Sequence, residues 1–78
     1  INEAFAVVTM ATIKELNLTH DKVNIFGGGV SLGHPIGCSG TRIVVTLMTA
    51  MENKNVKRGM ASICIGGGEA LALIIERI

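Results

Sequence analysis

Two apolar runs near the end of the chain constrain its fold more than any other feature. Met60 to Ile65 and Ala70 to Ile75 are apolar at nearly every position, and Gly66-Gly67-Gly68 separates them. Two short apolar runs joined by glycines predict an antiparallel β-hairpin. Because both alternating sets of side chains are apolar, we expect both faces of this hairpin to be covered.

The composition indicates a piece of a larger structure. The chain has 78 residues, of which 49% are hydrophobic and 17% are charged. A domain of this length buries only about 60% of its unfolded surface, so an independent core would be marginal. We therefore interpret residues 1–78 as a single incomplete domain whose apolar faces pack against further protein.

Charge and cysteine content exclude several classes of protein. The net charge is +1 and the only aromatic residues are two phenylalanines, which argues against binding to nucleic acid. No apolar stretch reaches the roughly 18 residues of a membrane span, and no signal-peptide pattern opens the sequence. Two cysteines do not make a disulfide framework. These features predict a soluble cytoplasmic protein with reduced thiols, and no peroxisomal address follows Ile78.

The remaining segments predict an α/β fold in the order α-β-α-β-β. Ile1 to about Asn17 has helical spacing of its apolar residues, namely Ala6, Met10, Ile13 and Leu16. Val23 to Phe26 is short and β-prone, and Gly27 to Gly37 follows as a loop. Ser39 to about Asn53 is expected to be a helix, with Ile43, Leu47 and Met51 in one row. A strand at 23–26 together with the C-terminal hairpin would form a mixed sheet.

His34 is the first candidate for chemistry. It lies between Gly33 and Pro35, where glycine leaves room beside the imidazole and proline restricts the backbone of the preceding residue. Such a histidine suits proton transfer from a thiol or support of a developing oxyanion. Taken alone, it is more often a loop or cap residue, and His20 is expected to be a solvated surface residue.

Cys64 and Gly66 form the second candidate cluster. Cys64 ends an apolar run before the three glycines, so it is either an inert core thiol or a thiol activated by nearby N–H groups. Gly66 could supply a backbone N–H to an oxyanion, or could merely belong to a turn. Cys38, near the start of the second helix, is either a nucleophile or a small packed residue.

Two further kinds of site are disfavoured. His34 and Cys38 are four residues apart, but no further His or Cys completes a metal ligand set, so we expect no metal. Glycines 27–29 and 66–68 lack the G-x-G-x-x-G order and the Walker lysine of phosphate loops. We expect no nucleotide hydrolysis and no resident cofactor.

Three motifs in register resemble the C-terminal part of the thiolase family. They are Asn2-Glu3-Ala4-Phe5-Ala6, the run Gly27-Gly28-Gly29-Val30-Ser31-Leu32-Gly33-His34-Pro35-Ile36-Gly37-Cys38-Ser39-Gly40-Thr41-Arg42, and Cys64-Ile65-Gly66-Gly67-Gly68. The resemblance covers essentially the whole chain. The triple glycine is more similar to the biosynthetic, acetoacetyl-CoA branch than to the long-chain degradative branch.

The resemblance implies a role for each candidate residue. His34 would take the proton from a nucleophilic cysteine, and Cys64 would remove the α-proton of acetyl-CoA. Asn2 would position a water in one oxyanion hole, and Gly66 would supply a backbone donor to the other. Ala4 and Phe5 would lie near the pantetheine arm. The implied reaction is a ping-pong thioester Claisen condensation or thiolysis between acetyl-CoA and acetoacetyl-CoA, and the full protein would be a dimer or tetramer.

Two departures from the family pattern qualify these implications. The family usually has a small or apolar residue at Cys38, which makes a packed variant the expected role there. The nucleophilic cysteine belongs to the N-terminal half of a thiolase and is absent from these residues, so the 78 residues alone are expected to be inactive. The alternatives are a degradative 3-ketoacyl-CoA thiolase, a non-catalytic thiolase-like acyl-CoA or lipid-binding protein, and a stand-alone assembly module.

Overall fold

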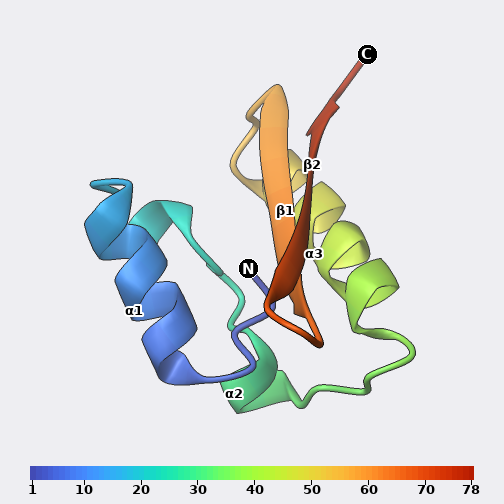
Figure 1. Ribbon diagram of the computed structural model, residues 1–78. Coiled ribbons are helices and arrows are strands. Elements are labelled where there is room, and N and C mark those ends of the chain that lie inside the picture. Colours follow the sequence, from blue (N-terminus) through green and yellow to red (C-terminus); the bar gives the residue numbers. More distant parts are fainter.

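The computed structural model describes residues 1–78 and consists of helices followed by one β-hairpin (Figure 1). Its elements are, in order, α1 (Ala6–Glu15), the 3₁₀ turn η1 (His20–Lys22), α2 (Gly29–Leu32), α3 (Ser39–Asn53), β1 (Arg58–Ile65) and β2 (Glu69–Glu76). The α/β class, the C-terminal antiparallel hairpin and the extent of the second predicted helix are confirmed. None of the helices has both the length and the apolarity that a membrane crossing requires.

The hairpin turn uses the three glycines as predicted. The two strands pair from Arg58 opposite Glu76 to Ile65 opposite Glu69, which leaves residues 66–68 as the loop. Gly67 and Gly68 have φ angles of 83° and 78°. Side chains disfavour this left-handed region, so glycine is suited to both turn positions.

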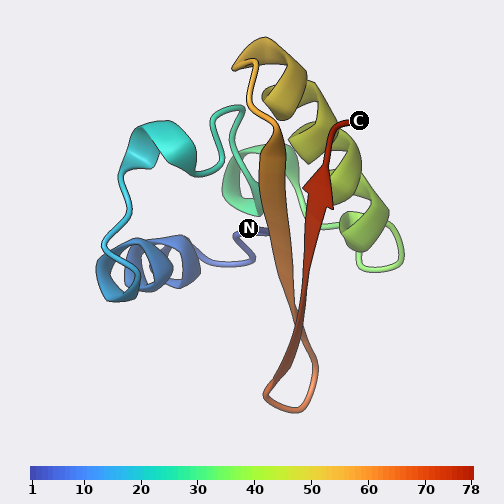
Figure 2. The same ribbon diagram turned by 90° about the horizontal axis from the view of Figure 1, so that it is seen from above.

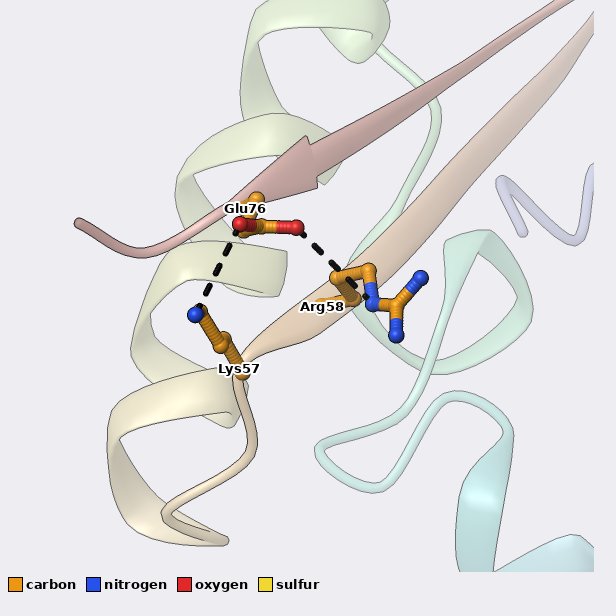
Figure 3. A network of polar contacts seen from close by, with 3 residues as sticks. All are labelled: Lys57, Arg58 and Glu76. Atoms are coloured by element: carbon orange, nitrogen blue, oxygen red, sulfur yellow. Dashed lines mark ion pairs between the residues drawn. The ribbon is translucent and has the colours of Figure 1, made fainter.

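Ion pairs lie at the open end of the hairpin (Figure 3). Glu76 is 3.8 Å from Lys57 Nζ through one carboxylate oxygen and 3.9 Å from Arg58 Nε through the other. All three side chains are exposed, and pairs of this kind contribute at most about 1 kcal/mol each. The hairpin therefore depends on its backbone ladder and on packing more than on this network.

Packing of α3 on β1 makes the core. Ile43 and Met51 of α3 are buried, as is Ala61 of β1, and Gly59 faces Met51. Since side chains alternate along a strand, residues 59, 61 and 63 face α3, while residues 60, 62 and 64 face away from it. Cys64 therefore lies on the face of the hairpin that α3 does not cover.

The prediction that both faces of the hairpin are covered is wrong for this chain. Leu71 and Ile74 of β2 remain 64% and 70% exposed. Only α3 among the helices makes substantial contact with the sheet, and it does so through β1. The apolar residues of β2 thus have no covering layer within these 78 residues.

No strand forms at Val23–Phe26, so the predicted mixed sheet is wrong as well. The sheet has two strands, β1 and β2. Asn24 has a φ of 48°, and the Gly27 N–H donates to the Asn24 carbonyl at 2.8 Å. This β-prone segment therefore forms a turn. The strand-like composition is overridden by this turn, and the short helix α2 follows in the predicted loop.

Helix α1 begins at Ala6 rather than at Ile1. Residues 1–5 lie outside the helix, because the Asn2 N–H donates to the Ser62 carbonyl of β1 at 3.1 Å. The expected apolar stripe is also wrong, since Thr9 is the buried residue of α1 while Met10 and Leu16 are 62% and 61% exposed. The helix stands apart from the hairpin in Figure 1, so the hairpin does not cover these two apolar side chains.

The N-terminal segment joins the hairpin to the glycine-rich loop. Asn2 bonds to the free edge of β1 through its N–H, and its carbonyl accepts the N–H of Gly29 at 2.7 Å. A Cβ atom at Gly29 would lie 2.7 Å from the Asn2 carbonyl oxygen and 2.8 Å from that of Glu3. Glycine is required here because two backbone segments approach each other closely.

This contact predicts opposite effects for two glycine substitutions. Gly29→Ala should lower the free energy of unfolding by about 1 to 3 kcal/mol, because backbone atoms must shift to admit the methyl group. Gly40→Ala, in α3, meets nothing within 4 Å and should raise it by about 0.5 to 1 kcal/mol through helix propensity. Urea denaturation followed by circular dichroism measures both. Equal effects of the two substitutions would contradict the proposed close contact.

Candidate active site

The structure brings together Asn2 and His34, two residues that are 32 positions apart in the sequence. Asn2 is 1% exposed. Its amide nitrogen Nδ2 lies 3.3 Å from both ring nitrogens of His34, Nδ1 and Nε2. The lone pairs of the two ring nitrogens lie in the ring plane and point apart, so an amide nitrogen equally close to both lies over the face of the imidazole and not on either lone pair.

The loop between α2 and α3 positions His34. Gly33 ends α2 with a φ of 95°, and Pro35 follows the histidine. The Pro35 carbonyl accepts the N–H groups of Cys38 and Ser39, both at 2.8 Å. The restricted proline backbone and these two bonds close the loop into the first turn of α3, directly beside the imidazole.

Sequence reasoning missed Ser39 as a partner of the histidine. Its Oγ lies 2.5 Å from His34 Nδ1 and donates to the Pro35 carbonyl at 3.0 Å. Ser39 is fully buried, at 0% exposure. The available signal was its position four residues after Pro35, which places the hydroxyl one helical turn from that carbonyl.

Cys64 and Gly66 lie farther along the hairpin. Cys64 is an exposed free thiol on β1, two residues and thus about 7 Å along the strand from Ser62, to which Asn2 is bonded. The hydrogen bonds of Asn2 and His34 do not reach Cys64 or Gly66. Gly66 begins a turn that projects beyond the helices (Figure 2), with open space where a Cβ would be.

The other residues singled out in the sequence lie around this centre. Phe5 is the N-cap of α1 and is 71% exposed, and Ala4 beside it is half-buried. Cys38 is the N-cap of α3 and its thiol is exposed and free, so the expectation of a packed residue is wrong. His20 is exposed in η1, as predicted.

Buried polar atoms without partners lie close to this centre. Asn2 Oδ1 and two guanidinium nitrogens of Arg42, Nε and one Nη, are buried and make no hydrogen bond within the chain. Such atoms carry a desolvation cost unless they are paired, so Asn2 Oδ1 is suited to accept a hydrogen bond from a bound group.

Comparison with known proteins identifies the family. Residues 1–77 match the family model described as Thiolase, C-terminal domain. The fold is also that of a solved relative: the crystal structure of the Bacillus anthracis acetyl-CoA acetyltransferase superposes on 96% of this chain with a TM-score of 0.89 and 52% sequence identity. The chain belongs to the thiolase family.

Individual relatives are similar over the whole chain but are much longer. A probable acetyl-CoA acetyltransferase of Dictyostelium discoideum is 58% identical over 78 residues, which are 100% of this chain and 19% of that protein. A 3-ketoacyl-CoA thiolase of Psychrobacter cryohalolentis is 54% identical over 80 residues, covering 100% of this chain and 20% of its own length. The chain thus spans about a fifth of these relatives, whose names belong to both branches of the family.

Proposed function

We propose that these residues form the acid–base part of an acetyl-CoA acetyltransferase active site. The reaction is a thioester Claisen condensation, or its reverse, thiolysis, between acetyl-CoA and acetoacetyl-CoA. An acyl group rests on a cysteine in another part of the protein between the two half-reactions. The observation that carries this proposal is the contact between buried Asn2 and His34, which joins two of the three family motifs.

His34 serves as the base for the nucleophilic cysteine in this proposal. Its ring is exposed, so a thiol from another segment can reach it, while Asn2 and Ser39 restrain it from the protein side. The buried, unpartnered Asn2 Oδ1 supports a role in holding a water that donates to the thioester oxygen. Such donors stabilise the negative charge that develops on that oxygen during acyl transfer.

Cys64 and Gly66 serve the second half-reaction. The exposed Cys64 thiol is accessible to acetyl-CoA, and removal of the α-proton by its thiolate gives an enolate that attacks the acyl group. The Gly66 N–H donates to the oxygen that becomes negative. This role needs the open backbone face that the structure has at Gly66.

Substrate contacts and assembly complete the proposal. Ala4 and Phe5 follow two and three residues after Asn2 in the sequence and offer apolar surface to a pantetheine arm. The exposed apolar face of β2 is covered by the remainder of an oligomeric protein, a dimer or tetramer. The cytosol is the proposed location, since relatives from Gibberella zeae and Rattus norvegicus are named cytosolic acetyl-CoA acetyltransferases.

A degradative 3-ketoacyl-CoA thiolase is the second candidate. It is favoured by the relatives of that name, including the one 54% identical to this chain. Comparing kcat/KM for acetoacetyl-CoA and for a long-chain 3-ketoacyl-CoA separates the two candidates. A non-catalytic acyl-CoA or lipid-binding protein would bind both thioesters and turn over neither.

Two substitutions in the full-length protein test the catalytic roles. His34→Ala and Cys64→Ala should each lower turnover of acetoacetyl-CoA by about 100-fold or more, in line with general acid–base contributions. The loss of the magnesium-enolate absorbance of acetoacetyl-CoA measures thiolysis. His20→Ala and Cys38→Ala are matched controls, since they remove the same side chains from surface positions. Near-normal rates for His34→Ala or Cys64→Ala would remove that residue from the mechanism.

The 78 residues by themselves should be inactive. They contain no residue at the proposed acyl-carrying position, so neither acylation nor condensation can begin. Incubation of the isolated chain with acetoacetyl-CoA and CoA is expected to leave the enolate absorbance unchanged, and mass spectrometry should find no acetylated cysteine. Turnover by the isolated chain would show that Cys38 or Cys64 acts as the nucleophile.

A further inference from the structure

The hydrogen-bond partners of His34 determine which ring nitrogen carries the proton. A neutral imidazole has one N–H and one lone pair, and the two nitrogens exchange roles between tautomers. Two groups bear on the choice, namely the Ser39 hydroxyl at Nδ1 and the Pro35 carbonyl beyond the hydroxyl. The Asn2 amide nitrogen is equally close to both ring nitrogens, so it favours neither.

Only one tautomer gives both the Ser39 hydroxyl proton and the ring proton an acceptor. The Ser39 hydroxyl has a single proton, which it donates to the Pro35 carbonyl at 3.0 Å. Its oxygen then accepts, so the proton between Oγ and His34 Nδ1 belongs to Nδ1. Nε2 is left with the lone pair, and the Asn2 amide, 3.3 Å from both ring nitrogens, packs over the ring face without occupying that lone pair.

The other tautomer brings two lone pairs together. With the proton on Nε2, the Nδ1 lone pair would face the Ser39 oxygen, whose only proton is already donated to the Pro35 carbonyl. Ser39 is also much the closer partner, at 2.5 Å against 3.3 Å for Asn2. The serine hydroxyl is therefore the contact that orients the ring.

We propose that Ser39 is a positioning residue for His34, whose hydroxyl accepts the Nδ1 proton and keeps Nε2 as the basic nitrogen. The Ser39 side chain is itself fixed, because it is completely buried and its hydroxyl donates to the Pro35 carbonyl one turn before it. In the acyltransferase reaction, the Nε2 lone pair takes the proton of the nucleophilic thiol as the sulfur attacks the thioester carbonyl. This kinetic consequence rests on the proposed function, whereas the tautomer does not.

The tautomer is measured on the full-length protein labelled with [¹⁵N]histidine. Ring nitrogens that carry a proton and those that do not have well-separated ¹⁵N shifts, and loss of signals in His34→Gln assigns the His34 pair. Wild type should have a protonated Nδ1 and an unprotonated Nε2. A protonated Nε2 in the wild-type protein would overturn the proposal without any variant.

Two variants and a matched control test the role of the hydroxyl. Ser39→Ala removes the acceptor and should shift the ring toward the Nε2–H form, with kcat lowered about 10- to 100-fold and KM changed little. Ser39→Cys keeps the volume with a weaker acceptor and should be intermediate, which covers the case in which Ser39→Ala does not fold. Thr49→Ala is the control, because Thr49 in the same helix also donates to the carbonyl four residues before it but contacts no histidine.

The outcomes separate this proposal from the proposed function. The positioning role would be overturned if both Ser39 variants kept the ¹⁵N ring shifts of wild type and had the same kcat and KM as Thr49→Ala. A wild-type protein with no thiolysis activity would overturn the proposed function, while its ring shifts would still decide the tautomer. Loss of folding stability with unchanged ring shifts in Ser39→Cys would assign Ser39 a structural role only.

Discussion

The backbone of Asn2 is the constraint on which the arrangement of this chain depends. Its N–H bonds to β1 and its carbonyl bonds to the first residue of α2, so one residue ties the hairpin to the glycine-rich loop. The same residue is buried and directs its amide to His34. The start of α2 and the strand β1 are thereby bonded to the same residue, and His34 lies beside that residue.

Much of the fold was predictable because it is encoded locally. The row of apolar residues from Ile43 to Met51 has a clear helical period, and three glycines between two apolar runs specify a hairpin turn. The motifs also identified Asn2, His34 and Cys64 as candidates. Their chemical roles come from the family resemblance, and the structure adds the Asn2–His34 contact.

The errors in prediction arise where a distant contact overrides local preference. Residues 1–5 continue the helical pattern, but the bond from Asn2 to Ser62 draws them out of α1. Val23 to Phe26 is β-prone, yet Asn24 adopts a left-handed turn there and the bond from Asn2 already uses the free edge of β1. The position of Ser39 four residues after Pro35 indicated only its bond to that carbonyl, because the loop that brings Ser39 to His34 is closed by backbone bonds to Pro35.

A double-mutant cycle on the full-length protein tests the central claim that Asn2 and His34 act as one unit. The kcat/KM for acetoacetyl-CoA thiolysis is measured for wild type, Asn2→Ala, His34→Ala and the double variant. The account predicts strong non-additivity, with a coupling of about 1 to 3 kcal/mol, because each residue acts through the same developing charge. A double variant whose loss equals the product of the two single losses would contradict it.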